Sequence, residues 1–328
     1  MIHPALAALF LLASMSLPAQ AFDCAKASTK TEKLICSDTE LKAADDAMGA
    51  AWKRLGDLLD KDEMQSMRVS QRAWLKWRSD RCGYGGDAER IECLEQLTSA
   101  RALLLAGEPR TGPGTGSRMV PFAFYQQGSK TRFEIDISGT RFAGPQRPGE
   151  VAFNKALDDG ISGAPVNDTV DFETPAQLSY SETMSVEYAG PQLLSVLSSV
   201  WRYDGGAHGN YYSTGLNFAL DQGELQFSDL FADAALQPLA IECRNRLSRA
   251  ETSEVLSPQE RRENLFEDTV AVFAEQMKSL RAWSFDTQGA RVHFAPYAIA
   301  SYAAGSFECR LPLELLSSLS KAPQYLPR

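Results

Sequence analysis

The segment YDGGAHGNYY, residues 203–212, places a histidine among three glycines. An imidazole beside a carboxylate can act as a general base, and two carboxylates at a defined separation can cleave a glycosidic bond. A serine nucleophile would need a recognisable elbow, but the sequence contains no G-x-S-x-G motif. Glycines, in contrast, permit the positive φ angles of a tight connection between strands. The segment therefore favours a turn that His208 helps to shape, with partner contact or catalysis by His208 as alternatives.

The cysteines and histidines do not form the pattern of a metal site. No two of the six cysteines have the C-x-x-C spacing of a zinc or redox site, and only His208 and His293 follow residue 21. We therefore expect no metal and no cofactor. An even number of cysteines is instead typical of disulfides in a protein of the periplasm or the cell exterior.

The first 21 residues have the pattern of a secretory signal peptide. Residues 5–17 form an apolar run of 13 residues, too short to span a bilayer, and Ala19-Gln20-Ala21 offers a small-x-small cleavage pattern. No later run is apolar for long enough to cross a membrane. The sequence thus predicts a periplasmic or secreted protein that begins at Phe22 and does not span the membrane.

A segment rich in glycine and proline divides the rest of the chain. We expect a helical domain over residues 22–107, a linker over 108–117 and a second domain over 118–328. Residues 22–108 carry 14 Lys+Arg against 16 Asp+Glu, and residues 109–328 carry 19 against 26, so about −7 of the net charge of −9 lies in the second part. This acidity disfavours nucleic acid as a partner and favours a basic protein.

The first domain has the periodicity of a small all-α domain. Thr29 and Glu32 have the spacing of a capping box at a helix start. Trp74 and Trp77 lie one turn apart, and we expect both to face the core. The apolar periodicity predicts further helices over about residues 41–59, 64–81 and 87–105.

Helices of this length make a thin core, so we expect disulfides to brace it. The four cysteines of this domain allow three pairings, and their spacing does not choose among them. An antiparallel hairpin would bring Cys36 near Cys82, whereas local pairing would join Cys24 to Cys36 and Cys82 to Cys93.

These motifs resemble a known family. The stretch FDCAKASTKTEKLICSDTELKAADDAMGAAW, followed by QRAWLKWRSDRCG and ECLEQLTSAR, is similar to the cysteine-braced amino-terminal domain of the LprI-type lysozyme inhibitors. The resemblance covers about residues 22–107 and implies protection of cell-envelope peptidoglycan against muramidases. It carries no residue-level inhibitory motif that could be assigned here.

The second domain has the pattern of an α+β domain, with a mainly antiparallel sheet and helices packed on one face. Cys243 lies on the apolar stripe of an expected helix, and Cys309 alternates inward along an expected strand. With the other cysteines in the first domain, elimination pairs Cys243 with Cys309. Helices are expected over about residues 148–161, 230–247 and 258–282.

Two longer stretches of this domain resemble a second family. LLSVLSSVWRYDGGAHGNYYSTGLNFALDQGELQFSDLF and WSFDTQGARVHFAPYAIASYAAGSFECRLPLELL are similar to the extracytoplasmic domain of RsiV-type proteins, which is also found attached to some peptidoglycan deacetylases. The resemblance, over about residues 118–320, implies direct binding of lysozyme. Anti-sigma regulation and deacetylation are not expected, because this sequence shows neither a sigma-binding segment with a membrane span nor a deacetylase domain.

The sequence therefore predicts an exported protein that binds a lysozyme-type muramidase, a basic protein, and inhibits it by steric occlusion. We expect no catalytic residue. The alternatives are a cell-wall hydrolase that uses His208 or His293 with a carboxylate, and a non-catalytic envelope scaffold. The expected partner contacts lie in the glycine-rich connection and are Asp204, His208, Asn210 and Tyr211.

Overall fold

The computed structural model describes residues 23–127, 133–163 and 178–328. The expected signal peptide, residues 1–21, lies outside these ranges. Within them, no helix combines the length and apolar character needed to cross a membrane.

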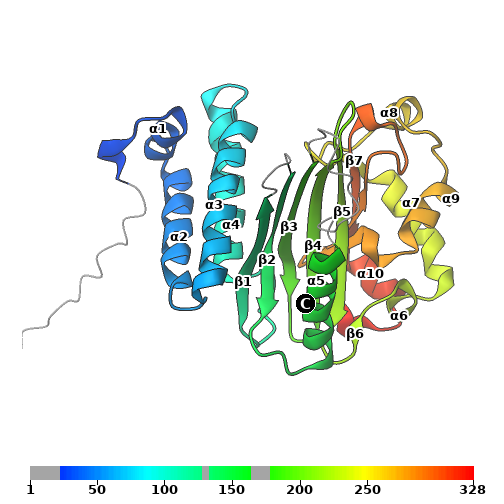
Figure 1. The fold of residues 1–328 in the computed structure, drawn as a ribbon. Helices are drawn as coiled ribbons and strands as arrows, with labels where there is room; N and C mark the ends of the chain where they lie inside the picture. The colour runs from blue at the N-terminus through cyan, green and yellow to red at the C-terminus, as the bar shows by residue number, and fades with distance from the viewer. Residues whose placement is uncertain (1–22, 128–132, 164–177) are drawn as a thin grey trace, which may run out of the picture.

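The amino-terminal part is a helical unit, as the periodicity predicts (Figure 1). Thr29 and Glu32 form the expected capping box at its first α-helix, and Asp60 and Glu63 form a second one. A short 3-10 segment, η1 (Cys24–Lys26), precedes the four helices. These are α1 (Lys30–Ser37), α2 (Thr39–Leu55), α3 (Lys61–Arg81) and α4 (Asp87–Ala106).

The disulfides of this unit are local. Cys24 is bonded to Cys36 and Cys82 to Cys93, so the alternative that joins Cys36 to Cys82 does not occur. The first disulfide ties η1 to α1, and the second bridges the turn between α3 and α4. Both therefore brace connections rather than link distant helices.

Trp77 does not face the core, and the expectation for this residue was wrong. Its side chain is 50% exposed, whereas Trp74 packs against the helical core. Arg78 takes the inward position next to Trp77: its guanidinium lies 5.2 Å from the centre of the Trp74 ring and donates to Thr98 Oγ1 at 2.8 Å. The buried arginine thus displaces the second tryptophan to the surface.

In the described ranges a six-stranded sheet follows, whose strands pair antiparallel except for the parallel pair β2 and β3. Helix α5 (Pro148–Gly163) covers one face, where Phe153 and Leu157 pack on Ile135 and Ile137 of β2. The sheet order follows the chain: β1 (Met119–Gln127), β2 (Phe133–Phe142), β3 (Leu178–Ala189), β4 (Leu193–Tyr203), β5 (Asn210–Ala219) and β6 (Gly223–Glu224).

A second, four-stranded antiparallel sheet has the order β7-β10-β9-β8. Its apolar face packs under short helices, and Cys243 of α7 is bonded to Cys309 of β10, the pair expected by elimination. The strands are β7 (Leu247–Arg249), β8 (Trp283–Asp286), β9 (Gly289–Phe294) and β10 (Phe307–Pro312). The helices are α6 (Phe227–Leu230), α7 (Leu236–Asn245), α8 (Pro258–Asn264), α9 (Val270–Met277) and α10 (Leu313–Leu319).

The fold class, an all-α unit followed by a mainly antiparallel α+β region, is confirmed, with two differences in detail. The α+β region holds two sheets rather than one. The single helix expected over 258–282 is interrupted after Asn264, because Leu265 forms a β-bridge with Ala300 and Phe266 donates its amide to the Ile299 carbonyl. Pairing with a distant segment here replaces the local helical hydrogen bonds.

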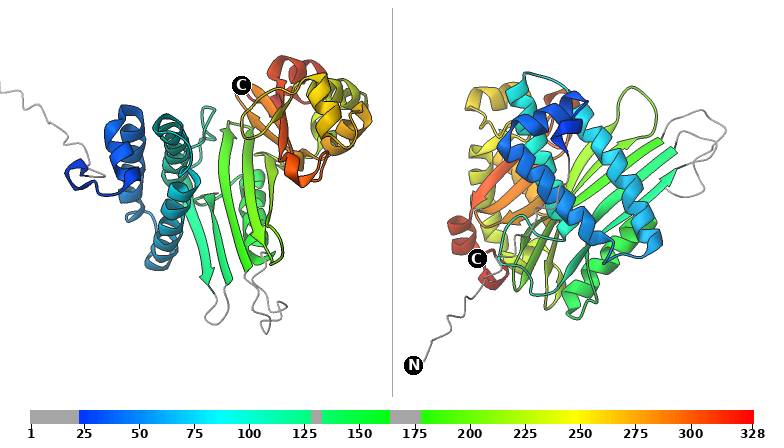
Figure 2. Two further views of the ribbon diagram at one scale, coloured as in Figure 1. Left: turned by 90° about the horizontal axis from the view of Figure 1, so that it is seen from above. Right: turned by 90° about the vertical axis from the view of Figure 1, so that its left-hand side faces the viewer.

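The small sheet meets the large sheet through its edge strand β8, on the face opposite α5 (Figure 2). The amide of Phe285 donates to Ser195 Oγ at 2.8 Å, and Asn217 Nδ2 donates to the carbonyl oxygen of Trp283 at 2.9 Å. Buried side chains of β4 and β5 thereby satisfy backbone groups that an edge strand would otherwise leave unpaired.

The helical unit packs on the same face through buried Arg101 of α4. Arg101 Nε donates to Gln71 Oε1 at 2.8 Å, and Nη1 donates to Ser138 Oγ of β2 at 3.1 Å. Asp136 of β2 lies nearby and is half-buried, and its burial raises its pKa although Ser70 and Arg101 act to lower it. The contact between the helical unit and the large sheet is therefore polar and charged as well as apolar.

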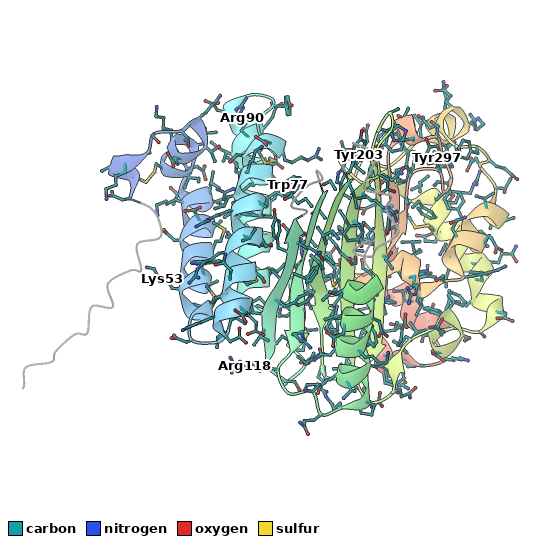
Figure 3. All side chains as sticks on the ribbon, viewed as in Figure 1. Lys53, Trp77, Arg90, Arg118, Tyr203 and Tyr297 are labelled. Carbon is teal, nitrogen blue, oxygen red and sulfur yellow. A yellow bond between two sulfur atoms is a disulfide. The ribbon has the colours of Figure 1, made fainter. Side chains whose placement is uncertain are left out.

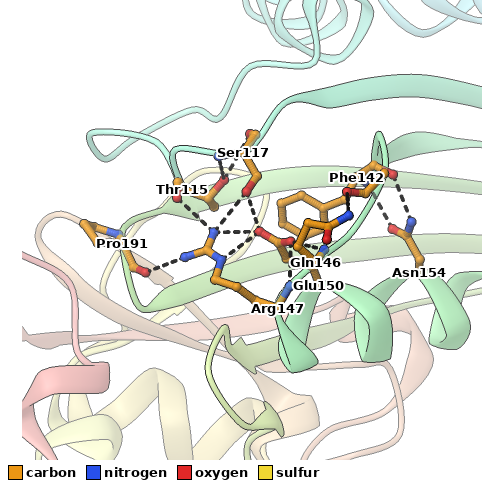
Figure 4. A network of polar contacts seen from close by, with 9 residues as sticks. Thr115, Ser117, Phe142, Gln146, Arg147, Glu150, Asn154 and Pro191 are labelled. Atoms are coloured by element: carbon orange, nitrogen blue, oxygen red, sulfur yellow. Dashed lines mark hydrogen bonds and ion pairs between the residues drawn. The ribbon is translucent and has the colours of Figure 1, made fainter.

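The expected linker, residues 108–117, runs along the sheet and is held by it. Arg110 donates its amide to the Val186 carbonyl at 2.8 Å, and Gly114 donates to the Ala189 carbonyl at 2.9 Å. Figure 4 shows the end of this segment at α5, where Arg147 donates to the Thr115 carbonyl and to Glu150. Burial raises the pKa of Glu150, but hydrogen bonds from Ser117, Gln146 and Arg147 outweigh burial and lower this pKa to about 2.

Candidate partner-binding surface

The connection between β4 and β5 is a tight turn, as the glycines predict. Gly205 and Gly206 have φ angles of 91° and 96°, which side chains rarely permit. The hydroxyl of Tyr203 donates to the Gly206 carbonyl at 3.0 Å and closes the turn. The glycines therefore serve the backbone of this connection.

His208 is fixed by a contact with a distant segment. Its ring stacks on Tyr302 of η4 (Tyr302–Ala304), with ring centres 3.9 Å apart and an interplanar angle of 22°. The Tyr302 hydroxyl donates to the Gly209 carbonyl at 2.8 Å, and His208 Nδ1 lies 2.9 Å from the same oxygen. The stacking and the hydrogen bond anchor the turn to the small-sheet region.

Further aromatic side chains surround this contact. Tyr211 meets Tyr302 edge-on at 5.8 Å, and Tyr297 lies 5.8 Å from Tyr302. On the other side, a Cβ atom on Gly209 would lie 2.4 Å from Trp201 Cζ2, so only glycine permits this close approach of the indole. We call this cluster the aromatic surface: Trp201, His208, Tyr211, Tyr297 and Tyr302.

Tyr297 has the most unusual conformation in this cluster. It is 57% exposed and has a φ angle of 70°, a region that bulky residues rarely adopt. Its amide donates to the Ala300 carbonyl at 3.0 Å, which closes a short turn. Figure 3 shows Tyr297 at the same end of the molecule as Tyr203. A strained, solvent-exposed aromatic residue is a feature of functional surfaces.

The aromatic surface combines hydroxyl donors with a nearby acid. Burial and the neighbouring Tyr211 and Tyr297 raise the pKa of Tyr302, so its hydroxyl remains a donor at neutral pH. A Cβ atom on Gly305 would lie 3.4 Å from Glu251 Oε1 and 3.8 Å from the Tyr211 hydroxyl, so this exposed carboxylate borders the tyrosines. The surface thus presents tyrosine hydroxyl groups beside a carboxylate.

The structure brings together two of the four expected contact residues. His208 and Tyr211 belong to the aromatic surface. Asp204 instead pairs with Arg202, its Oδ2 2.6 Å from Arg202 Nε, and Asn210 lies opposite Arg202 in the strand register. Because side chains alternate along a strand, Asn210 lies on the sheet face opposite to Tyr211.

Trp201, Tyr297 and Tyr302 were missed by sequence reasoning. Tyr297 and Tyr302 lie in APYAIASYAAGS, where two tyrosines stand among small residues in a segment without strand or helix periodicity. Exposed aromatic residues in such a segment are a signal for a binding loop. The signal does not say which turn they contact, since that contact spans more than 90 positions of the chain.

His293, the other histidine considered for catalysis, lies in a row across the small sheet. Its Nε2 is 2.8 Å from Ser284 Oγ and its Nδ1 is 3.9 Å from Glu308 Oε2. Burial and, to a lesser extent, Arg291 lower the pKa of His293 to about 4, so the ring is neutral at neutral pH. Ser284 is only 4% exposed, and 3.9 Å is too long for a hydrogen bond. The row favours a role in stabilising the sheet over nucleophilic catalysis.

This buried imidazole predicts acid sensitivity. In the folded chain His293 stays neutral down to about pH 4, whereas the unfolded imidazole gains a proton below about pH 6.5. The contribution of the neutral His293 ring to the free energy of unfolding is therefore complete above pH 6.5. It falls by about 3 kcal/mol as the pH falls towards 4. Urea unfolding of wild type and of His293→Gln at pH 7, 5.5 and 4.5 measures this difference.

Glu308 also makes stability depend on pH, but it is present in both proteins, so comparing them isolates the effect of His293. Burial raises the pKa of Glu308, so its effect on stability with falling pH has the opposite sign to that of His293. The wild type should lose more stability on acidification than His293→Gln. Equal losses would show that His293 does not contribute.

Among the residues that the structure describes, no group of three or more histidine, cysteine or acidic side chains is placed to hold a metal ion.

Two family models match different parts of the chain. Residues 24–105 match the family model "Lysozyme inhibitor LprI", and residues 228–314 match "Protein of unknown function (DUF3298)". The two matches confirm the expected order of an LprI-type domain followed by a second family domain, and the DUF3298 match falls within the region that resembles RsiV-type proteins. No curated protein matches the chain.

Solved structures of DUF3298 proteins are among those similar to the chain. A DUF3298 family member from Bacteroides fragilis is 14% identical, with a TM-score of 0.41, over 63% of this chain and 94% of that one. A DUF3298 family protein from Pseudomonas aeruginosa is also 14% identical, with a TM-score of 0.43, over 65% of this chain and 98% of that one.

Proposed function

We propose that this protein is an exported inhibitor that binds a lysozyme-type muramidase and obstructs its substrate cleft. The observation that carries the proposal is the match of residues 24–105 to the lysozyme inhibitor LprI model. The inhibition is steric, since it requires only that a rigid surface occupy the cleft. Peptidoglycan is the polymer thereby protected.

The aromatic surface supports this proposal. Tyrosine side chains combine a large contact area with a hydrogen-bonding tip and lose little conformational entropy on binding. The stacking of His208 on Tyr302 and the hydrogen bond to Gly209 hold the surface in place before the partner arrives. A pre-organised surface binds more tightly because less ordering is needed on association.

The charge of the domain supports the same partner. Residues 109–328 carry 26 Asp+Glu against 19 Lys+Arg. An acidic domain accelerates its encounter with a basic protein such as lysozyme, and salt screens this attraction. We therefore expect the association rate to fall as the ionic strength rises.

The aromatic surface is tested by inhibition assays with chicken-type lysozyme on a peptidoglycan suspension. Tyr297→Asn removes the exposed ring and keeps a residue that tolerates the left-handed conformation. We expect Tyr297→Asn and His208→Ala each to weaken inhibition about tenfold, as loss of a central aromatic contact does. Thermal unfolding checks that each variant is folded.

Tyr84→Ala is the matched control. Tyr84 is 83% exposed in the turn between α3 and α4, outside the aromatic surface. Its replacement should leave inhibition unchanged. Wild-type protein that fails to slow lysozyme would refute the proposed function, and inhibition unaffected by either surface variant would refute this placement of the contact.

Incubation of the mature protein with peptidoglycan alone tests the alternative of a hydrolase. No soluble fragments should be released. Release that His208→Ala or His293→Gln abolishes would establish an enzyme instead.

A further inference from the structure

An open groove of about 420 Å³ lies between α2 and α3 of the helical unit. Its lining is mainly apolar, with Met48 and Trp52 on α2 and Leu75 on α3. Two exposed arginines of α3, Arg68 and Arg72, also line it. The groove belongs to the helical unit and shares no residue with the aromatic surface.

Gly49 helps to make the groove. It lies in the middle of α2 and lines the hollow between Met48 and Trp52. A glycine inside a helix is about 1 kcal/mol less favourable than alanine. Gly49 therefore contributes backbone and no side chain to the lining of the groove.

The arginines are free to bind a ligand. In the described part of the chain, neither Arg68 nor Arg72 forms an ion pair or a hydrogen bond with another side chain, whereas Arg78 and Arg101 of the same unit are buried in networks. Residues 64–79 contain four basic side chains and no acidic one, although the whole chain has a net charge of −9. This stretch of α3 is therefore a local basic stripe on an acidic protein.

The groove floor favours a hydrocarbon side chain over a sugar. Gln71 is the polar side chain on the floor, and its amide is already occupied: Oε1 accepts from Arg101 Nε, and Nε2 lies 3.6 Å from Met48 Sδ. Sugar hydroxyls would lose water there without gaining partners. An aliphatic or aromatic side chain would instead be buried against Trp52, Leu75 and Met48.

From this arrangement we infer that the α2–α3 groove binds an acidic protein segment. An apolar side chain of the segment enters the hollow, and neighbouring carboxylates pair with Arg68 and Arg72. Arginine pairs with carboxylates through two parallel hydrogen bonds, and tryptophan and arginine are the usual anchors of such contacts. The partner has the opposite charge to lysozyme, so the inference does not depend on the proposed function.

Fluorescence polarisation tests the inference with the full mature chain. The probe is a labelled peptide Glu-Glu-Leu-Phe-Glu-Glu, and the comparison peptide is Lys-Lys-Leu-Phe-Lys-Lys. We expect the acidic peptide to bind at least tenfold more tightly, with an affinity that falls as salt is added. The double variant Arg68→Ala, Arg72→Ala should lose at least tenfold of this affinity.

Two further variants separate the groove from charge and folding effects. Arg54→Ala removes an exposed arginine of α2 outside the groove lining and should change the affinity less than twofold. Gly49→Ala should weaken binding severalfold while thermal stability is unchanged or raised, because alanine favours the helix and adds a methyl group to the lining of the groove.

Three results would overturn the inference: equal binding of both peptides, full affinity in the double arginine variant, or an effect of Arg54→Ala as large as that of the double variant. A fourth overturning result could come from sedimentation of the protein with phosphatidylglycerol vesicles. Binding to the vesicles that requires Arg68 and Arg72, with no binding of the acidic peptide, would assign the groove to a membrane surface instead.

Discussion

Replacing Arg101 by alanine will lower the free energy of unfolding by about 4 kcal/mol. Arg101 is 2% exposed, and although burial lowers its pKa to about 10, it remains charged at neutral pH. The substitution would leave the half-buried Asp136 without its nearby positive charge and would remove the donors to Gln71 and Ser138. Removing one partner of a buried charged network typically costs about 3–5 kcal/mol. Urea unfolding monitored by tryptophan fluorescence measures the loss.

Two further variants make this prediction specific. Arg90→Ala removes an arginine from the same helix, where its Nε donates to the exposed Gly85 carbonyl, and should change stability by less than about 1 kcal/mol. Adding Asp136→Asn to Arg101→Ala should recover part of the loss, because the uncompensated carboxylate is then absent. Equal losses in Arg101→Ala and Arg90→Ala would show that the network between the helical unit and the sheet contributes little.

Removing the disulfide between Cys243 and Cys309 should cost a similar amount. The two cysteines are 66 positions apart, and cross-linking a chain over that separation stabilises the folded state by about 4 kcal/mol through the entropy of the unfolded chain. Both residues are completely buried in the core under the small sheet. The double variant Cys243→Ala, Cys309→Ala should therefore unfold at a much lower urea concentration.

The disulfide between Cys24 and Cys36 is the matched control. It closes a separation of only 12 positions, and the η1 segment that it holds contains no buried residue. Its removal releases a surface segment, so we expect the global unfolding free energy to change by less than about 1 kcal/mol. A larger loss here than for Cys243 and Cys309 would contradict the prediction.

The local pattern of the sequence predicted the helical unit well. The spacing of Thr29 and Glu32 predicted a capping box, and the apolar stripe predicted α2, because helix caps and amphipathic faces depend on residues three or four positions apart. The interior of the unit was less predictable. Trp77 and Arg78 are neighbours in the chain, and their exchange of inside and outside depends on Thr98 of another helix.

Pairing across long separations accounts for the differences in the second domain. The pattern over 258–282 is helical, yet Leu265 pairs with Ala300 and the helix ends before it. Backbone groups at the edge of β8 form hydrogen bonds with the side chains of Ser195 and Asn217. The sequence shows a polar residue within an apolar strand, but it does not show which backbone groups form hydrogen bonds with that residue.

The aromatic surface was also predicted only in part. The glycines around His208 predicted a turn, and Gly205 and Gly206 have the expected positive φ angles. The sequence also drew attention to Tyr211. It did not predict that Tyr302 stacks on His208, because that contact depends on how the two sheets meet.

By itself, the sequence determined the helical unit with its cysteine bracing, the mixed second domain and the resemblance to lysozyme-inhibitor proteins, since these depend on local spacing and composition. Only the tertiary structure decided which cysteines pair in the helical unit, that Arg101 joins this unit to the sheet, and that His208, Tyr211 and Tyr297 surround Tyr302. The contacts of Arg101 and of the aromatic surface gain their energy from desolvation and packing between segments far apart in the chain, which no local pattern specifies. The two disulfides of the helical unit are local, but the spacing of four cysteines is compatible with more than one pairing, and only the folded helices decide among them.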